Sequence, residues 1–124
     1  MVKLSSSVLL VSVLASVTNA ASGFLNNNIC DRNTLSYNND QTLSVTCKGK
    51  VLTIKLSNCI ANSNGQLVWR PSKPNFTGCA GCSVRDINLI CDTCFKLDGD
   101  AVEYNPGVRL NNGIGYVNGK LTCA

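Results

Sequence analysis

Apolar and polar residues alternate along several stretches of the chain. In residues 43–47 and again in residues 52–56, every second side chain is apolar and those between are Ser, Thr or Lys. This period of two is typical of β-strands with one buried face. Asn-Gly pairs at positions 64–65, 112–113 and 118–119 predict tight turns, because both residue types tolerate positive φ. No long helical stripe follows the N-terminal segment, so we expect an all-β domain with one helical turn near each of two Leu-Asn blocks.

The first 20 residues have the layout of a secretory signal peptide. Lys3 precedes an apolar run at positions 8–17, and Thr18, Asn19 and Ala20 supply the small residues that signal peptidase prefers. The run is too short to span a bilayer, and a buried N-terminal helix would need a polar face that it lacks. We expect cleavage after Ala20 and a secreted, extracellular protein without a membrane span.

The remaining residues, 21–124, contain an internal repeat. The segments LSNCIANSNGQLVW (56–69) and LNNGIGYVNGKLTC (110–123) begin at the two Leu-Asn blocks and share six of fourteen positions without a gap. Three landmarks precede the segments in the same order: Phe24, Cys30 and Cys47 in the first half, and Phe76, Cys79 and Cys94 in the second. Repeats of about 50 residues usually represent a duplicated supersecondary unit. We predict a single domain with repeat one at about 22–69, a hinge at 70–75 and repeat two at about 76–124.

All eight cysteines follow the signal segment, and an exported chain with an even cysteine count favours disulfides. In CAGCSVRDINLICDTC (79–94), a hairpin turning between Asp86 and Ile87 would place the cysteines opposite one another, as Cys79–Cys94 and Cys82–Cys91. These two pairs would fall on opposite faces of the hairpin. Repeat symmetry predicts Cys30–Cys47, which leaves Cys59–Cys123. The same two Cys-x-x-Cys pairs also match a zinc-ribbon pattern, so zinc stays open as the alternative.

The amino-acid composition excludes some kinds of catalytic site and disfavours other functions. The chain has no histidine, which excludes Ser-His-Asp and Cys-His nucleophile pairs. The formal net charge is only +4 and the basic residues are scattered, so nucleic-acid binding has little support. Asp98, Asp100 and Glu103 form an acidic cluster that could hint at calcium or a carboxylate pair, but a solvated loop is favoured. We expect a protein that is not an enzyme and needs no metal or other cofactor.

Asparagine is abundant, with 15 residues after the signal segment. Each amide offers two donors and an acceptor without charge, which suits hydroxyl-rich neutral ligands, although Asn is also a common turn residue.

The two halves resemble the cyanovirin-N family of sugar-binding proteins. The resemblance is carried by LSNCIANSNGQLVWRP, NFTGC and LNNGIGYVNGKLTC, and it covers essentially residues 22–123. It implies a pseudo-symmetric duplicated fold in which the halves exchange strands, giving triple-stranded sheets plus β-hairpins. It also implies a lectin for mannose, typically α1,2-linked mannose of high-mannose glycans. Each Asn-Gly turn would contribute to one of two sites at opposite ends of the molecule.

The resemblance assigns candidate sugar-binding residues to the two sites. The middle-chain site would use Asn62, Ser63, Asn64, Asn75, Thr77 and Lys96. The terminal site would use Tyr116, Val117, Asn118, Lys48 and Lys50. The chain departs from the family at Ala61, where an acidic residue is usual, and at Tyr116, which replaces a small amide but could stack on a sugar ring. We rank the middle-chain site first.

Asn75-Phe76-Thr77 is also an N-glycosylation sequon, and a glycan on Asn75 would block the middle-chain site. The expected partners are mannose-containing glycans or glycoproteins, and the chain is expected to be a monomer or a strand-swapped dimer. The alternative function is a disulfide-stapled secreted interaction protein that has lost sugar binding.

Overall fold

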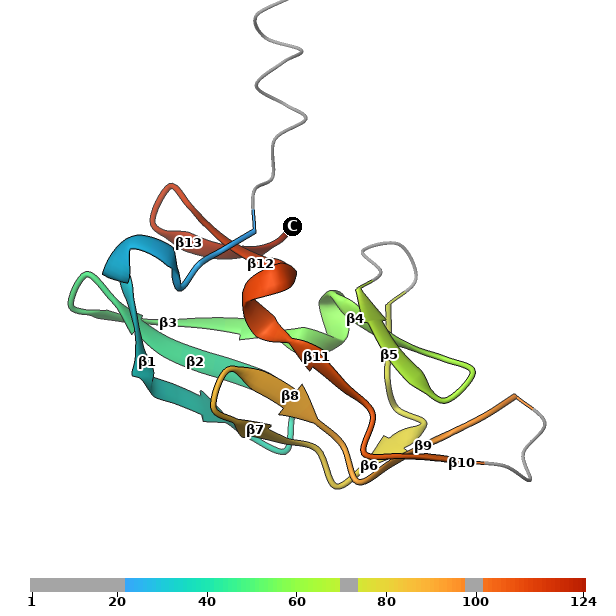
Figure 1. The fold of residues 1–124 in the computed structure, drawn as a ribbon. Coiled ribbons are helices and arrows are strands. Elements are labelled where there is room, and N and C mark those ends of the chain that lie inside the picture. The colour runs from blue at the N-terminus through green and yellow to red at the C-terminus, as the bar shows by residue number, and fades with distance from the viewer. Residues whose placement is uncertain (1–21, 70–73, 98–101) are drawn as a thin grey trace, which may run out of the picture.

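The computed structural model describes residues 22–69, 74–97 and 102–124. Within these ranges the chain forms short strands joined by tight connections and single turns of 3-10 helix (Figure 1). The elements of the first half are η1 (Asn26–Asn28), β1 (Cys30–Tyr37), β2 (Thr42–Cys47), β3 (Lys50–Lys55), η2 (Leu56–Asn58), β4 (Ile60–Ser63) and β5 (Gln66–Trp69). Those of the second half are β6 (Cys79–Ala80), β7 (Ser83–Arg85), β8 (Asn88–Ile90), β9 (Thr93–Phe95), β10 (Val102–Tyr104), β11 (Gly107–Arg109), η3 (Leu110–Asn112), β12 (Ile114–Val117) and β13 (Lys120–Cys123). The expected all-β class is confirmed, and η2 and η3 are the helical turns predicted at the Leu-Asn blocks.

In the first half, β1, β2 and β3 form an antiparallel sheet. The central strand shows the predicted alternation, because Leu43, Val45 and Cys47 are buried and the residues between them are partly exposed. One face of the sheet is therefore apolar and must be covered by another element. After η2, β4 and β5 form a separate hairpin in which Ser63 lies opposite Gln66.

The second half repeats this order with one difference. The strands that correspond to the three-stranded sheet are broken, so β6–β9–β10 and β7–β8–β11 are two small antiparallel sheets. Gly81 stands at the break between β6 and β7 with a φ of +65°, and a Cβ there would collide with the carboxylate of Asp92. Glycine is therefore required at this bend both for its backbone conformation and for the space that it leaves.

The bend changes how the two disulfides of this half are placed. The hairpin turns where expected, between β7 and β8, and Cys79 and Cys82 are bonded to Cys94 and Cys91. The expectation that the two bridges lie on opposite faces is wrong, because the sulfurs of Cys79, Cys91 and Cys94 lie within 4.8 Å of one another. Faces alternate strictly only along an uninterrupted strand, and the bend at Gly81 interrupts it.

The other two disulfides join Cys30 to Cys47 and Cys59 to Cys123. All four pairings agree with the sequence-based expectations. Cys59–Cys123 connects the end of η2 to β13 and so ties the two halves together. All eight cysteines are used in these bonds, which leaves none as a thiolate for zinc. The structure therefore gives the zinc alternative no support.

Each half is completed by residues from the other half. The backbone N–H groups of Gly23 and Phe24 donate hydrogen bonds of 2.9 and 3.1 Å to the carbonyls of Asn111 in η3 and Ile114 in β12. In the same way, Asn75, the last hinge residue before repeat two, donates to the carbonyl of Ile60 at 2.8 Å and accepts from the N–H of Asn62 at 3.0 Å. Figure 1 shows the N-terminal segment in blue beside the red hairpin. The expected exchange of strands between halves is confirmed.

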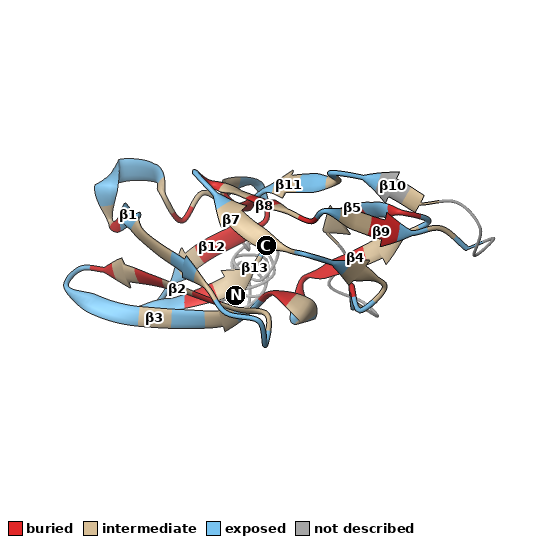
Figure 2. Ribbon diagram, turned by 90° about the horizontal axis from the view of Figure 1, so that it is seen from below, coloured by how far each residue is buried: buried red, intermediate tan, exposed pale blue. Residues whose placement is uncertain are grey.

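One apolar core runs through both halves. Its largest fully buried residues include three pairs related by the repeat: Phe24 with Phe76, Leu56 with Leu110, and Ile60 with Ile114. Full burial of a side chain of this size contributes about 2 kcal/mol. Figure 2 shows buried stretches on β2, β8, β9 and β12, with exposed residues between and beyond them. The duplicated sequence thus supplies a single, pseudo-symmetric core.

Asn112-Gly113 is not the tight turn that its sequence predicts. The pair ends η3, and Gly113 has a φ of −131°, which any residue can adopt. Gly113 is buried, and a Cβ on it would collide with the ring of Trp69 in β5. Glycine is needed here because two halves of the molecule approach closely, and not because of the backbone conformation.

Several sequence-based predictions fall on segments outside the described residues. They concern the signal peptide at 1–20, most of the hinge at 70–73, and Asp98 and Asp100 of the acidic cluster. Of the helices in the described ranges, none is both long enough and apolar enough to cross a membrane.

Candidate functional site

The middle-chain site centres on the turn of the β4–β5 hairpin. Asn64 and Gly65 form its two-residue loop with φ values of +49° and +92°. Positive φ at both loop positions gives the twist that antiparallel strands need, which is why the Asn-Gly pair occurs here. The loop therefore presents Ser63 and Asn64 at the tip of a well-defined hairpin.

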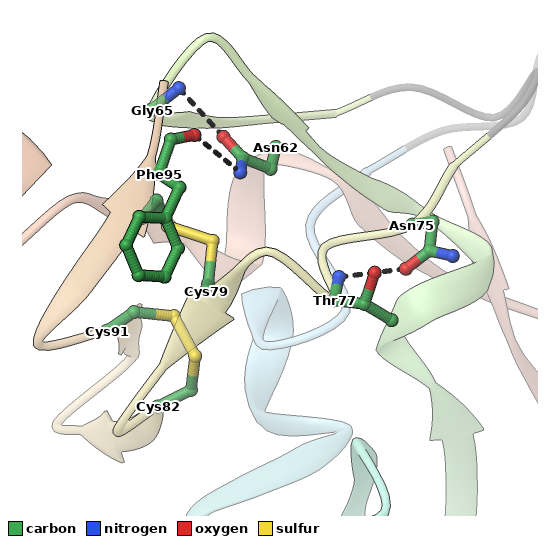
Figure 3. Close-up of a disulfide and its surroundings, with 9 residues drawn as sticks. Asn62, Gly65, Asn75, Thr77, Cys79, Cys82, Cys91 and Phe95 are labelled. Atoms are coloured by element: carbon green, nitrogen blue, oxygen red, sulfur yellow. Dashed lines mark hydrogen bonds between the residues drawn. A yellow bond between two sulfur atoms is a disulfide. The ribbon is translucent and has the colours of Figure 1, made fainter. Parts of the chain in front are cut away.

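The side chain of Asn62 holds this tip against the end of β9 (Figure 3). Its Oδ1 accepts a hydrogen bond of 2.8 Å from the N–H of Gly65, and its Nδ2 donates to the carbonyl of Phe95 at 3.0 Å. Gly78 leaves room for this amide, since a Cβ there would lie 2.8 Å from Nδ2 of Asn62. Asn62 was expected to contact sugar, but both ends of its amide are already bonded within the protein.

The side chain of Asn64 also forms a hydrogen bond within the protein, but only through its oxygen. Its Oδ1 accepts a hydrogen bond of 2.8 Å from the N–H of Leu97. Its amide nitrogen has no partner among the described residues, and the side chain is exposed. Asn64 can therefore offer two N–H donors to a ligand without leaving its structural role.

The segment at the start of the second half lies beside this hairpin. Asn75 forms a parallel bridge with Ala61, and its Oδ1 accepts a hydrogen bond of 2.8 Å from the N–H of Thr77. Figure 3 shows the Asn75 side chain pointing to Thr77, whereas Asn62 points to Phe95. The amide nitrogen of Asn75 and the hydroxyl of Thr77 belong to exposed residues. Half-buried Lys96 comes directly after β9, whose last residue, Phe95, accepts the hydrogen bond from Asn62.

The structure therefore brings most of the middle-chain candidates to one end of the molecule. The groups that it leaves for a ligand are mainly amide N–H and hydroxyl groups, together with the ammonium of Lys96. Such a surface can donate and accept hydrogen bonds without strong charge.

Sequence reasoning did not single out the exposed side chains of Phe95 and Leu97 at this end of the molecule. They directly flank the candidate Lys96 in the sequence, which was the available signal, but their exposure depends on the fold.

The terminal site has the same turn at the β12–β13 hairpin. Asn118 and Gly119 have φ values of +53° and +77°. The ammonium of Lys48, in the β2–β3 turn, lies 5.8 Å from the centre of the Tyr116 ring, which is within the range of a cation–π contact. Val117 and Lys50 are exposed. Lys48 and Tyr116 are thus brought together, and Lys48 occupies the approach to one face of the ring that was expected to stack on sugar.

Asn26, Asn27 and Asn28 are residues near this site that sequence reasoning missed. They form η1 and are exposed, and Oδ1 of Asn26 accepts a hydrogen bond of 3.0 Å from Nδ2 of Asn111. They follow Phe24 as Thr77 follows Phe76 in the other half. The repeat was therefore the signal that could have identified them.

The groups with shifted acidity lie away from both sites, at the β1–β2 connection. Burial raises the pKa of Tyr37, and the nearby charge of Asp40 raises it further. Hydrogen bonds from the side chain and backbone of Thr42 lower the pKa of Asp40. These shifts reflect local packing and do not identify an acid–base site.

Comparisons with known proteins agree with this architecture. The profile of the CVNH domain family matches residues 27–122. The solved structure of TbCVNH, from T. borchii, is 26% identical, has a TM-score of 0.57 and aligns over 73% of this chain and 91% of that chain. A designed cyanovirin-N homolog lectin, LKAMG, is 21% identical and shares the fold, with a TM-score of 0.58 over 75% of this chain and 97% of that chain. No curated protein sequence matches the chain. The chain therefore belongs to the CVNH, or cyanovirin-N homolog, domain family.

Proposed function

We propose that this chain is a secreted carbohydrate-binding lectin that recognises mannose, with a preference for the α1,2-linked residues of high-mannose glycans. Membership of the CVNH family is the general support. The observation that carries the proposal is that β4 lies beside Asn75 and the segment leading to Thr77, because this gathers uncharged donors and acceptors along one hairpin. Mannose is neutral and rich in hydroxyl groups, so it matches this chemistry.

Each residue has a distinct role in the proposed middle-chain site. Asn62 positions the hairpin tip, as its two hydrogen bonds require. Asn64 donates its amide N–H groups to sugar hydroxyls, and Ser63 and Thr77 donate or accept through their hydroxyls. Lys96 donates from the edge of the site. A polar group that becomes buried against a sugar stabilises the complex only when it finds a hydrogen-bond partner there. The site therefore selects sugars whose hydroxyl groups match the positions of its donors and acceptors.

A second, weaker site is proposed at the β12–β13 end, with Tyr116, Val117, Asn118, Lys48 and Lys50. It ranks below the first because Lys48 lies over the Tyr116 ring. The hairpins that carry the two sites lie apart in Figure 1. Two weak sites on one rigid molecule can raise avidity for a branched glycan without any new contact.

Secretion is part of the proposal. Four disulfides in so short a chain are typical of proteins that fold in an oxidising compartment. In a eukaryotic secretory pathway the sequon at Asn75 would be available for glycosylation, since Asn75 and Thr77 are exposed. A glycan there would cover the middle-chain site and lower its affinity for sugar.

The decisive experiment is isothermal titration of the mature, unglycosylated chain with α1,2-mannobiose. The variant Asn64→Asp keeps a side chain suited to the turn and an acceptor for the N–H of Leu97, but it removes the two N–H donors. The matched control is Asn118→Asp, which makes the same change in the other turn. We expect saturable binding by the wild type, binding weakened at least about tenfold in Asn64→Asp, as for loss of a hydrogen bond worth about 1.5 kcal/mol, and near wild-type binding in Asn118→Asp.

Two other outcomes have clear meanings. Binding lost in Asn118→Asp and kept in Asn64→Asp would move the principal site to the terminal hairpin. A correctly folded wild type that gives no binding heat with mannobiose would overturn the mannose proposal. The interaction-protein alternative would then lead.

A further inference from the structure

A cleft lies next to the middle-chain site but involves none of its candidate residues. It has a volume of about 260 Å³ and is lined by Gln66, Leu67, Tyr104, Pro106 and Gly107. One wall is β5 and the other is the connection between β10 and β11. Figures 1 and 2 both show these elements near each other, on the side of the molecule that carries the β4–β5 hairpin.

The β4–β5 hairpin links the cleft to the proposed mannose site, because it contributes residues to both. Gln66 follows Gly65 of the turn and lies opposite Ser63 in the strand register. Directly opposed residues of an antiparallel pair project from the same face. A ligand that contacts Ser63 at the tip can therefore extend past Gln66 toward Tyr104.

The far wall is held on both sides by backbone hydrogen bonds. Tyr104 pairs with Thr93 in the sheet register, and the next residue, Asn105, donates to the carbonyl of Asp92 at 3.0 Å. The carbonyl of Pro106 accepts from the N–H of Cys91, also at 3.0 Å. The backbone that carries the Tyr104 ring is thus fixed before any ligand arrives, which lowers the entropy cost of binding.

The chemistry of the lining points to a neutral ligand that is partly apolar. None of the five lining side chains carries a charge. Tyr104 is 75% exposed, so its ring is open to contact, and Leu67 is buried in the floor. Gln66 is exposed and supplies an amide. An aromatic ring beside an amide suits a pyranose, because one face of the sugar presents C–H groups and its rim presents hydroxyls.

We propose that this cleft is a second subsite of the middle-chain site and holds the next sugar ring of the same glycan. The ring stacks on Tyr104 while the amide of Gln66 bonds one of its hydroxyls. This inference rests on the proposed mannose binding and adds to it a preference for chains longer than a disaccharide.

The test compares linear α1,2-mannobiose with α1,2-mannotriose on the mature, unglycosylated chain. We expect the wild type to bind the trisaccharide about three- to tenfold more tightly than the disaccharide, the size of effect that an aromatic contact gives. Tyr104→Ala removes this gain and leaves disaccharide affinity unchanged. Tyr104→Phe, which keeps the ring, retains the gain. Val51→Ala, which alters an exposed apolar residue of β3, is the matched control and behaves as wild type.

Amide chemical shifts supply an independent readout. The trisaccharide, but not the disaccharide, is expected to shift the amide signals of Gln66 and Gly107. A full trisaccharide gain in Tyr104→Ala, or no gain in the wild type while the disaccharide still binds, overturns the subsite alone. A folded wild type that binds neither sugar overturns the mannose proposal and the subsite with it.

Discussion

At the scale of single residues, glycine and asparagine serve several different purposes in this chain. Gly65 and Gly119 supply positive φ in hairpin turns, whereas Gly113 has an ordinary φ and leaves space for the ring of Trp69. Both the oxygen and the nitrogen of the Asn62 amide are hydrogen-bonded within the protein, whereas the amide nitrogen of Asn64 has no partner among the described residues. The same residue type therefore does not imply the same role, because the role depends on what surrounds each position.

The role of Gly113 leads to a prediction. Gly113→Ala would force a methyl group into the Trp69 ring, and overpacking of this kind typically costs about 1–3 kcal/mol. Denaturant unfolding followed by fluorescence should show this loss, since Trp69 is the only tryptophan of the chain. Gly49→Ala is the control, because a Cβ there meets nothing within 4 Å and the cost is confined to its positive φ. Equal stability of the two variants would contradict the close-approach explanation.

At the scale of elements, the β4–β5 hairpin is both a candidate binding element and a docked structural one. Its tip is tied to the end of β9 by side chains, through Asn62 to Phe95 and Asn64 to Leu97. The hairpin register follows from the Asn-Gly turn, but the identity of the strand that receives its tip does not. The β6–β7 break at Gly81 likewise depends on contacts with a neighbouring segment.

This docking predicts a structural effect for Asn62→Ala. The change leaves the carbonyl of Phe95 and the N–H of Gly65 without their partner, and each hydrogen bond typically contributes about 0.5–1.5 kcal/mol to stability. Hydrogen exchange at the amide of Gly65 should become faster, and the denaturation midpoint should fall. Asn33→Ala, at an exposed position of β1, is the matched control. Wild-type exchange at Gly65 in Asn62→Ala would show that the tip does not depend on this amide.

At the scale of the whole molecule, the two halves form one unit and not two. Phe24 of repeat one bonds to Ile114 of repeat two, and Asn75, at the end of the hinge that leads into repeat two, bonds to β4. The core is continuous across the halves, and Cys59–Cys123 connects them covalently. Each half by itself therefore exposes the apolar surface that the other half covers.

It follows that residues 22–69 should not fold alone. With Cys59→Ser to avoid an unpaired thiol, this fragment is expected to give the narrow amide spectrum of an unfolded chain, because Phe24 and Ile60 lose their partners from the second half. The control is the full mature chain with Cys59→Ser and Cys123→Ser, which keeps the core and should remain folded. A well-dispersed spectrum from the fragment would mean that strand exchange is not needed for folding.

The sequence by itself determined the strand class, the duplication and the hairpins at Asn64-Gly65 and Asn118-Gly119, because these depend on local periodicity and turn chemistry. It also predicted the disulfide pairing from register and repeat symmetry, with zinc as the alternative. Residues such as Leu43 and Val45 could be assigned to a buried face by alternation alone. The tertiary structure decided what no local pattern contains: the bend that brings two disulfides together, the space that Gly113 leaves for Trp69, and the use of the Asn62 amide within the protein. It also placed Tyr104 beside Gln66, because the cleft is formed by strands that are far apart in the chain and meet only when the halves pack together.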